Sequence, residues 1–534
     1  MTNPTTPMRK RIAVIGAGAA GLAQAKQVLD AFRTHDGVAV ELVVFESRTD
    51  VGGVWLEDPD AGVYRVNTDP ATNTTRIIPA EPGVLPSPIY PGLRTNLPKY
   101  IRFGTTVTRV YKCDSREDGQ SQPGWVVQSR LNGRDEGGVR SERFHYVSVT
   151  SGHYEKASIP QVGGLDKFTG QVMHSRWYRR PEDFIGKNVL VVGSFASGSD
   201  IARELASVNL PSSVLPESMT AHKPARLADH QSTSDRELAG KIRVYQSSSQ
   251  TPNMFTSGLA ADMEDDQRPW LRLIEQRPLI DRIETSTTPS TEGREEVAGS
   301  SSVVHFTDGS TLTDIDVIIF ATGYLYYYPF FKQSDAPWNR EECRILDTPI
   351  GEADVLGGER EGEGNTGGLQ GLGMRHMDEL MLFLEDDRSM AFIGLPYQVV
   401  PFPLFEIQSH LVSLLWAGKL PHFPKHPTIP QRPSEDIVPP TPPETPRDST
   451  GTTPIAAYSG ANGGNPAVVR EQRYTEKVRG AYVFGFPYEF LYENYLLSLT
   501  AEADGGKDGG WGEVEEFRWY WRQQKELRFQ TIGY

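Results

Sequence analysis

The sequence predicts an α/β protein with two dinucleotide-binding domains of the strand-turn-helix-strand type, with Pro- and Gly-rich insertions between the folded parts. Two observations support this prediction. A strand-like apolar run, a glycine-rich turn and a helical apolar pattern follow one another near residue 16 and again near residue 193. The chain has 534 residues, which is too many for one hydrophobic core, so about three folding units, or two with large insertions, are expected.

Composition narrows the possible partners. The formal net charge of −15 argues against a nucleic-acid partner, because phosphate binding needs clustered Lys and Arg, and it favours a small neutral or cationic substrate. Cys113 and Cys343 are the only cysteines, which excludes a disulfide framework and a zinc site of several thiolates. The N-terminus is polar, and no apolar run approaches the roughly 18 residues of a membrane helix. We therefore expect a cytoplasmic protein without a membrane span.

The first glycine-rich turn follows the apolar run Ile12–Ile15 and precedes a helix and a second strand, Glu41–Phe45. In such a unit the first glycine permits a tight turn, the second lets the backbone approach a pyrophosphate, and the third lets helix and strand pack closely. The helix N-terminus attracts phosphate, and an acidic residue ending the second strand binds a ribose diol. The expected dinucleotide contacts are Gly16, Gly18, Ala19, Ala20, Gly21 and Glu46.

A double glycine follows this unit. Gly52-Gly53-Val54-Trp55 lets the backbone run close beside a flat ring, and in combination with Glu46 it resembles FAD sites rather than NAD sites. We expect Gly53, Val54 and Trp55 to contact FAD. The alternative is a plain turn without a ligand.

The second turn, Gly193-Ser-Phe-Ala-Ser-Gly198, follows the strand Val189–Val192. Phe195 stands where the middle glycine belongs, and its side chain can hinder close approach to a pyrophosphate. The hydroxyls of Ser194 and Ser197 partly compensate as donors. The expected contacts in this loop are Gly193, Ser194, Ser197 and Gly198.

The residues that follow this second unit favour NADP over NAD. The next strand is expected to end near Thr220–Lys223, with Arg226 just beyond, and no carboxylate occupies the ribose position. Positive groups there accept a 2′-phosphate, so Arg226 is a predicted NADPH contact. The alternative is that these are solvated loop charges.

The remaining elements complete the two predicted domains. Alternation typical of sheet predicts three strands, Thr105–Tyr111, Trp125–Leu131 and Phe144–Thr150. Two later strands are predicted at Asp316–Phe320 and Ala391–Leu395. A helix is predicted after the second of these, from about Leu404 to Ala417, and Gly418 closes it. Three tracts are predicted to be unstructured: 285–302, 351–373 and 428–468. The predicted boundaries are 9–180, first part of the FAD domain; 181–320, NADPH domain; 321–425, second part of the FAD domain; 426–470, disordered Pro-rich insert; and 471–534, a C-terminal helical segment on the FAD domain.

The segment between the two turns carries a family signature. Residues Phe168 to Tyr178, with Gly170 and His174, fit the pattern FxGxxxHxxx(Y/F) and resemble the flavin-containing monooxygenases, which are class B flavoprotein monooxygenases. Weaker matches are Glu46 with the double glycine and Trp55, Thr95-Asn96-Leu97-Pro98, and Phe320-Ala-Thr322-Gly323-Tyr324.

The resemblance implies FAD and NADPH on two nested Rossmann-like domains. It implies that NADPH reduces FAD, that reduced flavin captures O2 at C4a, and that the hydroperoxide oxygenates nitrogen or sulfur of a small nucleophilic substrate. It makes Asn96 the predicted catalytic residue, since its amide would lie beside the flavin, and it makes Thr322 and Gly323 cofactor contacts. The alternative for Asn96 is a turn residue.

Related classes fit less well. Baeyer-Villiger enzymes would carry Trp at position 178 with Pro or Asp after it, whereas here Tyr178 precedes Arg179. Disulfide reductases share the two glycine loops but need two neighbouring reactive cysteines, which this sequence lacks. We interpret His174 as an orienting hydrogen-bond partner rather than a general acid or base. The helix beginning near Leu404 either directs its N-terminus at the flavin pyrimidine edge or is a plain core helix.

One departure from the family pattern affects the expected function. Lys99-Tyr100 joins the Thr-Asn-Leu-Pro motif directly to Ile101–Val110, where the family has several tens of residues that include a helix. If Ile101–Val110 is the third parallel strand, its crossover would normally carry that helix over one sheet face. Either an exon is missing from the gene model, or the protein has lost the part of the FAD domain that covers this sheet face. Such a loss would expose apolar side chains of the sheet and admit water to the flavin. A third hypothesis is therefore a cofactor-binding protein with uncoupled or absent turnover.

Overall fold

The computed structural model describes residues 8–33, 38–55, 64–69, 74–79, 98–113, 124–133, 138–211, 241–249, 269–286, 301–346, 369–371, 373–429, 484 and 488–504. They form two compact units. The first unit comprises Met1–Gly53, Gly92–His153 and Leu325–Gln523, and the second comprises Val54–Pro91, Tyr154–Tyr324 and Gln524–Tyr534. The main segment of the second unit interrupts the first, and each unit has a parallel sheet with helices, so the predicted nested α/β class is confirmed.

The first unit is built on a six-stranded sheet in the order β21-β22-β9-β1-β2-β5. Its strands are β1 (Met8–Ile15), β2 (Val38–Phe45), β5 (Ile101–Arg102), β9 (Tyr146–Val149), β21 (Phe383–Leu384) and β22 (Asp387–Phe392). All neighbours are parallel except β21, which pairs antiparallel with β22. The carboxyl ends of β22, β9, β1, β2 and β5 therefore share one edge of the sheet.

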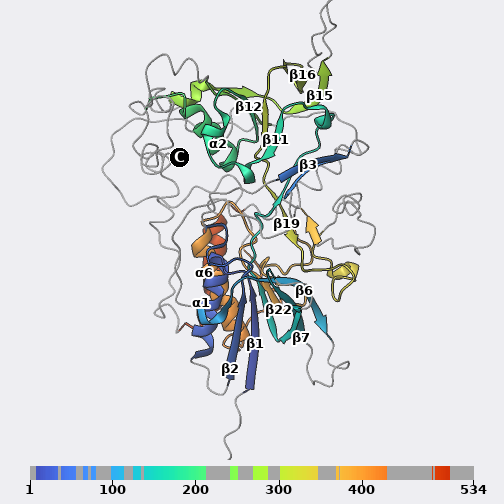
Figure 1. The fold of residues 1–534 in the computed structure, drawn as a ribbon. Helices are drawn as coiled ribbons and strands as arrows, with labels where there is room; N and C mark the ends of the chain where they lie inside the picture. The colour runs from blue at the N-terminus through green and yellow to red at the C-terminus, as the bar shows by residue number, and fades with distance from the viewer. Residues whose placement is uncertain are drawn as a thin grey trace, which may run out of the picture. The chain divides into compact units, whose positions relative to one another are not determined.

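Helices cover one face of this sheet (Figure 1). α1 (Ala19–Arg33) and α6 (Pro401–Trp416) pack side by side, and α8 (Tyr488–Thr500) packs on α6. The predicted end of the apolar helix is confirmed: the N–H of Gly418 donates to Leu415 O at 3.0 Å, and the N–H of Lys419 donates to Leu414 O at 2.9 Å. Gly418 can close the helix because its φ is 72°, which favours glycine.

An antiparallel sheet covers the other face. It consists of β6 (Thr105–Cys113), β7 (Gly124–Leu131) and β8 (Arg140–Phe144). Its side chains pack against those side chains of the parallel sheet that lie on the face opposite α1 and α6. Two of the predicted sheet runs are thus confirmed as β6 and β7. The third run divides, because β8 stays antiparallel while β9 enters the parallel sheet.

The prediction that Ile101–Val110 forms one parallel strand is wrong. Only Ile101 and Arg102 pair with β2, and residues from Thr105 onward pair with β7. The chain turns at Gly104, whose φ of 60° lies in the left-handed region. The parallel strand is therefore short, and the antiparallel sheet begins directly after it.

The connection from β2 to β5 is the segment in which the family helix was expected. Its described residues form the 3-10 turns Gly53–Trp55 and Pro98–Tyr100 and the hairpin of β3 (Tyr64–Asp69) and β4 (Thr74–Pro79), with no α-helix among them. The apolar sheet is nevertheless covered. Val43 is 5% exposed on one face and Val44 is 0% exposed on the other, so the expected exposure of β2 does not occur.

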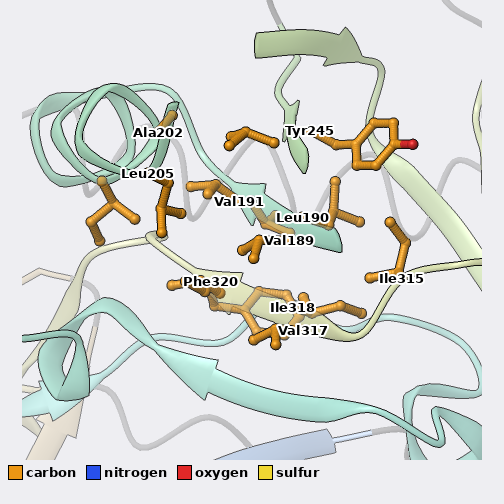
Figure 2. Close-up of a cluster of buried hydrophobic side chains, with 14 of the residues drawn as sticks. Val189, Leu190, Val191, Ala202, Leu205, Tyr245, Ile315, Val317, Ile318 and Phe320 are labelled. Carbon is orange, nitrogen blue, oxygen red and sulfur yellow. The ribbon is translucent and has the colours of Figure 1, made fainter. Parts of the chain in front are cut away.

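The second unit contains a five-stranded parallel sheet in the order β11-β18-β12-β13-β14. Its strands are β11 (Gln171–His174), β12 (Asn188–Val192), β13 (Arg243–Ser247), β14 (Ile274–Arg277) and β18 (Val317–Phe320). α2 (Ala196–Ser207) follows β12, and Figure 2 shows Ala202 and Leu205 of α2 against the apolar side chains of the sheet. The strands outside the sheets described above are β10 (Lys156–Ala157), β15 (Ile280–Ser286), β16 (Ser301–Phe306), β17 (Thr311–Leu312), β19 (Tyr324–Tyr328) and β20 (Leu369–Gly371). The prediction of unstructured tracts is wrong at the ends of 285–302, which join β15 and β16, and at β20 within 351–373, because these residues pair with neighbouring strands.

Candidate cofactor sites

Two glycines of the first loop are required by the fold itself. Gly16 has a φ of 103°, and its N–H donates to Phe45 O at 2.8 Å. A Cβ at Gly21 would lie 1.9 Å from Gly16 O, so no other residue fits there. These two positions allow α1 to begin tightly against the end of β1. Their glycines would be needed with or without a ligand.

Gly18 differs, because the fold does not require it. It lies outside the positive-φ region, and a Cβ there would be 3.5 Å from Gly53 Cα, an ordinary contact. The double glycine lies beside it: Gly18 and Gly52 form a parallel bridge, and the N–H of Gly52 donates to Ala17 O at 3.0 Å. Gly18 is best explained by a group that must approach its backbone closely, as a pyrophosphate does. The predicted residues Gly18 and Gly53 are thus brought together, and the loop fits a dinucleotide.

Glu46 is buried against the same loop, at 4% exposure. Its Oε2 accepts the N–H of Ala17 at 2.7 Å, and its Oε1 accepts the N–H of Arg48 at 2.9 Å. Oε1 also accepts the hydroxyl of Ser47 at 3.4 Å, whereas Oε2 can accept a second hydrogen bond, such as one from a ribose hydroxyl. Glu46 therefore also fixes the loop, a role that its position at a strand end does not reveal.

Thr150 supports the loop from the end of β9, and the sequence reasoning missed it. Its Oγ1 lies 2.8 Å from Ile15 O and 3.0 Å from Gly16 O, and its N–H donates to Ile15 O. A hydroxyl residue directly after an apolar strand was the available signal. Thr150 therefore fixes the backbone of the turn that carries Gly18.

The second loop repeats the geometry of the first. Gly193 has a φ of 109°, and a Cβ there would lie 2.5 Å from Ala321 O. A Cβ at Gly198 would lie 2.3 Å from Gly193 O, which matches the relation of Gly21 to Gly16. The turn needed to open α2 against β12 is therefore present.

Phe195 does not distort this turn. Its φ of −81° and ψ of −177° are extended backbone that any residue adopts, and it is the N-cap residue of α2. Its side chain is 44% exposed, Ser197 is exposed, and the carbonyl of Ser194 accepts the hydroxyl of Ser199 at 2.7 Å. The predicted hindrance at Phe195 is thus a matter of side-chain bulk and not of backbone shape.

The predicted position of the next strand in the second unit is wrong. The parallel partner of β12 on that side is β13, which ends at Ser247, whereas we expected a strand end near Thr220–Lys223. The prediction used the ordinary spacing of about 20 residues from glycine loop to strand end, and the connection here is longer. The residues after β13 begin with Ser248 and Ser249, so this end again lacks a carboxylate. Arg226 lies outside the described residues.

The remaining predicted contacts of the first site are placed as follows. Ala19 and Ala20 are the first residues of α1, and Val54 and Trp55 lie in the 3-10 turn after Gly53, half-buried. Asn96 lies outside the described residues, so its role stays a prediction.

Comparison with known proteins extends these observations. The family model of flavin-binding monooxygenase-like proteins matches residues 92–219 and 291–345. Flavin-containing monooxygenase 5 of Oryctolagus cuniculus is 31% identical over 356 residues, and flavin-containing monooxygenase 2 of Homo sapiens is 30% identical over 367 residues. Each alignment covers 61% of this chain and 64% of the relative, so the chain spans less than two thirds of these relatives. Over these parts of its length the chain is similar to flavin-binding monooxygenase-like proteins.

A solved structure supports the same fold. S-allyl-L-cysteine S-oxygenase from Allium sativum superposes with a TM-score of 0.51 at 19% identity, covering 99% of this chain and 95% of that one. At this identity the likeness shows the architecture alone. The resemblance inferred from the sequence motifs is confirmed as a similarity over part of the chain.

The histidine of the signature segment has a structural environment. His174 is fully buried; its Nδ1 accepts the N–H of Arg176 at 3.1 Å, and its Nε2 lies 3.0 Å from Gly323 O. Nε2 therefore carries the proton and donates to that carbonyl. Burial lowers the pKa of His174 to about 3, which keeps the ring neutral. This agrees with an orienting role and not with acid or base work.

Thr322 and Gly323 belong to the same bonded segment. The hydroxyl of Thr322 donates to Ser158 O, and the N–H of Ser158 donates to Gly323 O at 2.9 Å. Gly323 has a φ of 81°. These contacts hold the turn after β18 in place, at the carboxyl edge of the parallel sheet, beside the turn that contains Gly193.

Tyr178, the last residue of the signature, joins the signature segment to α2. Its hydroxyl donates to Glu204 Oε2 at 2.8 Å. Burial, followed by the neighbouring carboxylate, raises the pKa of Tyr178, and burial raises the pKa of Glu204. Tyr178 thus keeps its proton and packs the signature against the helix of the second loop.

Among the described residues, no helix is long and apolar enough to cross a membrane.

Proposed function

We propose that this chain is an FAD- and NADPH-dependent monooxygenase that transfers one oxygen atom from O2 to nitrogen or sulfur of a small nucleophilic substrate in the cytoplasm. The observation that carries the proposal is Gly18, a glycine that the fold does not need, placed at the carboxyl edge of a parallel sheet opposite a double glycine. The names of the curated relatives, flavin-containing monooxygenases, support the activity.

The residues of the first unit would bind FAD. The pyrophosphate would lie against Gly18 and the first turn of α1, where backbone N–H groups and the helix dipole favour negative charge. The carboxylate of Glu46 would accept hydrogen bonds from the adenosine ribose while it keeps the loop in place through Ala17. When bound, FAD supplies the redox chemistry: it takes a hydride from NADPH and, once reduced, activates O2.

The residues of the second unit would bind NADPH. The turn from Gly193 to Gly198 and the first N–H groups of α2 would hold its pyrophosphate, and the hydroxyl of Ser197 is exposed beside them. The two described residues that follow β13, Ser248 and Ser249, carry no carboxylate, which suits a 2′-phosphate better than a free ribose diol. Asn96 and Arg226 remain predicted contacts of the flavin and of the 2′-phosphate.

The proposal is tested with the purified chain. We expect it to contain FAD, to lose its oxidised flavin absorbance when NADPH is added without oxygen, and to convert a thioether to its sulfoxide in air. Flavin that stays oxidised under anaerobic NADPH would refute the proposal. A ketone converted to an ester in place of thioether oxidation would identify a Baeyer-Villiger enzyme instead.

A second candidate function is oxidation of NADPH without substrate oxygenation. The observation that favours it is the connection between β2 and β5, whose described residues contain no α-helix. Water in the flavin site would release reduced oxygen as peroxide. Peroxide formed in a one-to-one ratio to NADPH in the presence of thioether would support this candidate, whereas sulfoxide formed in that ratio would exclude it.

A further inference from the structure

A buried carboxylate lies at the start of α6. Glu489, in the first turn of α8, is 0% exposed, and its Oε2 accepts the N–H of Val400 at 2.9 Å. Val400 is the N-cap residue of α6, and its own side chain cannot cap the helix. Glu489 therefore supplies the cap from another helix, 89 residues away in the chain.

The sequence at the start of α6 leaves this helix with few free backbone N–H groups at its N-terminus. The first four N–H groups of an α-helix, from the N-cap onward, have no partner within the helix. Two of these four positions in α6 are Pro401 and Pro403, which have no N–H. One of the two remaining donors, on Val400, is bound by Glu489. The positive end of α6 is thus partly neutralised by a full negative charge from the protein itself.

The start of α6 opens at the sheet edge that carries the first glycine loop. α6 follows β22, which is parallel to β9, and β9 is parallel to β1, so all three carboxyl ends face the same way. At the usual spacing of strands, β22 lies about 10 Å from β1. Glu46 follows β2, on the other side of β1, and would hold the adenosine ribose. The flavin half of an FAD bound at Gly18 would then lie on the side of β9 and the start of α6.

We propose that Glu489 lowers the reduction potential of the bound flavin by holding a negative charge at the helix end that would otherwise stabilise the reduced ring. The inference rests on the proposed flavin function. Reduction adds electrons to the ring, and the added negative charge is stabilised by a helix N-terminus and opposed by a carboxylate beside it. Glu489 acts through the N-terminus of α6 as a positioning residue for charge and not as a catalytic residue.

Other contacts already hold α8 on α6, so the charge of Glu489 is not needed as a clamp. Gln408 Nε2 donates to the hydroxyl of Tyr492 at 3.1 Å, and that hydroxyl donates to Leu380 O at 2.8 Å. His410 Nε2 lies 2.9 Å from Asp504 Oδ1. A purely structural role for Glu489 would therefore predict a loss of stability on its replacement, without a change in the flavin potential.

The test compares four proteins as FAD-loaded holoenzymes: wild type, Glu489→Gln, Glu406→Gln and Tyr492→Phe. Gln at 489 keeps an oxygen for the Val400 N–H and removes the charge. Glu406 is an exposed carboxylate in the second turn of α6, and its charge is screened by water. Tyr492→Phe weakens the contact between α8 and α6 without changing any charge. The readouts are the flavin midpoint potential from spectroelectrochemistry and the thermal unfolding midpoint.

We expect Glu489→Gln to favour reduced over oxidised flavin by about 5-fold to 30-fold relative to wild type, the range of a charge at a helix terminus. For a two-electron couple this is a potential about 20 to 45 mV more positive. The potentials of Glu406→Gln and Tyr492→Phe should stay at the wild-type value, while the unfolding midpoint of Tyr492→Phe falls.

An unchanged or more negative potential in Glu489→Gln, or an equal shift in Tyr492→Phe, would overturn the inference and leave the proposed function intact. If Glu489→Gln retains too little FAD to measure, Glu489→Asp supplies the second measurement. This variant keeps the charge and is expected to keep a potential close to that of wild type, so a large positive shift in it would also count against the inference. A wild-type protein without FAD would overturn both the inference and the proposed function.

Discussion

Replacing Gly18 by Ala separates a glycine kept for a ligand from the glycines kept for the fold. A methyl group at Gly18 would lie 3.5 Å from Gly53 Cα, so the protein should accommodate it. The same methyl group would project from the backbone that a pyrophosphate has to approach. Loss of one hydrogen bond to a charged phosphate costs about 1.5–3 kcal/mol. We therefore expect FAD to bind Gly18→Ala about 10-fold to 150-fold more weakly than wild type.

Two further alanine variants make the measurement decisive. Gly138→Ala is the matched control, because a Cβ there meets nothing within 4 Å. Gly21→Ala would place its Cβ 1.9 Å from Gly16 O and should destabilise the first unit itself. FAD affinity is measured by titrating apoprotein and following flavin fluorescence, and stability by thermal unfolding of the apoprotein. Wild-type FAD affinity in Gly18→Ala, or an unfolding midpoint as low as that of Gly21→Ala, would refute the reasoning.

Three other predictions concern the second unit. Gly198→Ala should lower the unfolding free energy by about 1–3 kcal/mol, because its Cβ would lie 2.3 Å from Gly193 O; a thermal midpoint equal to that of wild type would contradict this. Phe195→Gly should tighten NADP+ binding up to about 10-fold, or 1.4 kcal/mol, if side-chain bulk is the hindrance, and calorimetry showing equal affinity would exclude it. His174 is neutral in the fold with its pKa lowered to about 3, so the unfolded chain binds the extra proton, and stability from this group is lost as pH falls from 6.5 toward 3. His174→Gln should therefore show a flatter loss of stability than wild type over that window, and parallel curves would disprove the assignment.

Local patterns in the sequence were enough to locate both glycine loops. Gly16 and Gly193 have a φ in the left-handed region, and a Cβ at Gly21 or Gly198 would meet the carbonyl of Gly16 or Gly193, so these requirements are set within one turn and the helix after it. Gly418 ends α6 for the same kind of local reason. Predictions failed where the chain had to choose partners over a distance. Ile101–Val110 divides at Gly104, and β13 lies farther along the chain than the ordinary spacing suggests.

By itself the sequence determined the α/β class, the two glycine loops and the acidic residue that follows β2, because each depends on the order and spacing of a few adjacent residues. Only the tertiary structure decided what those residues contact. It placed Glu46 on the N–H of Ala17, the double glycine against Gly18, and Glu489 on the first donor of α6. The physical reason is that hydrogen bonds and helix electrostatics act over a few ångströms in space, and residues 29 or 89 positions apart come within that range only when the sheet and helices have packed.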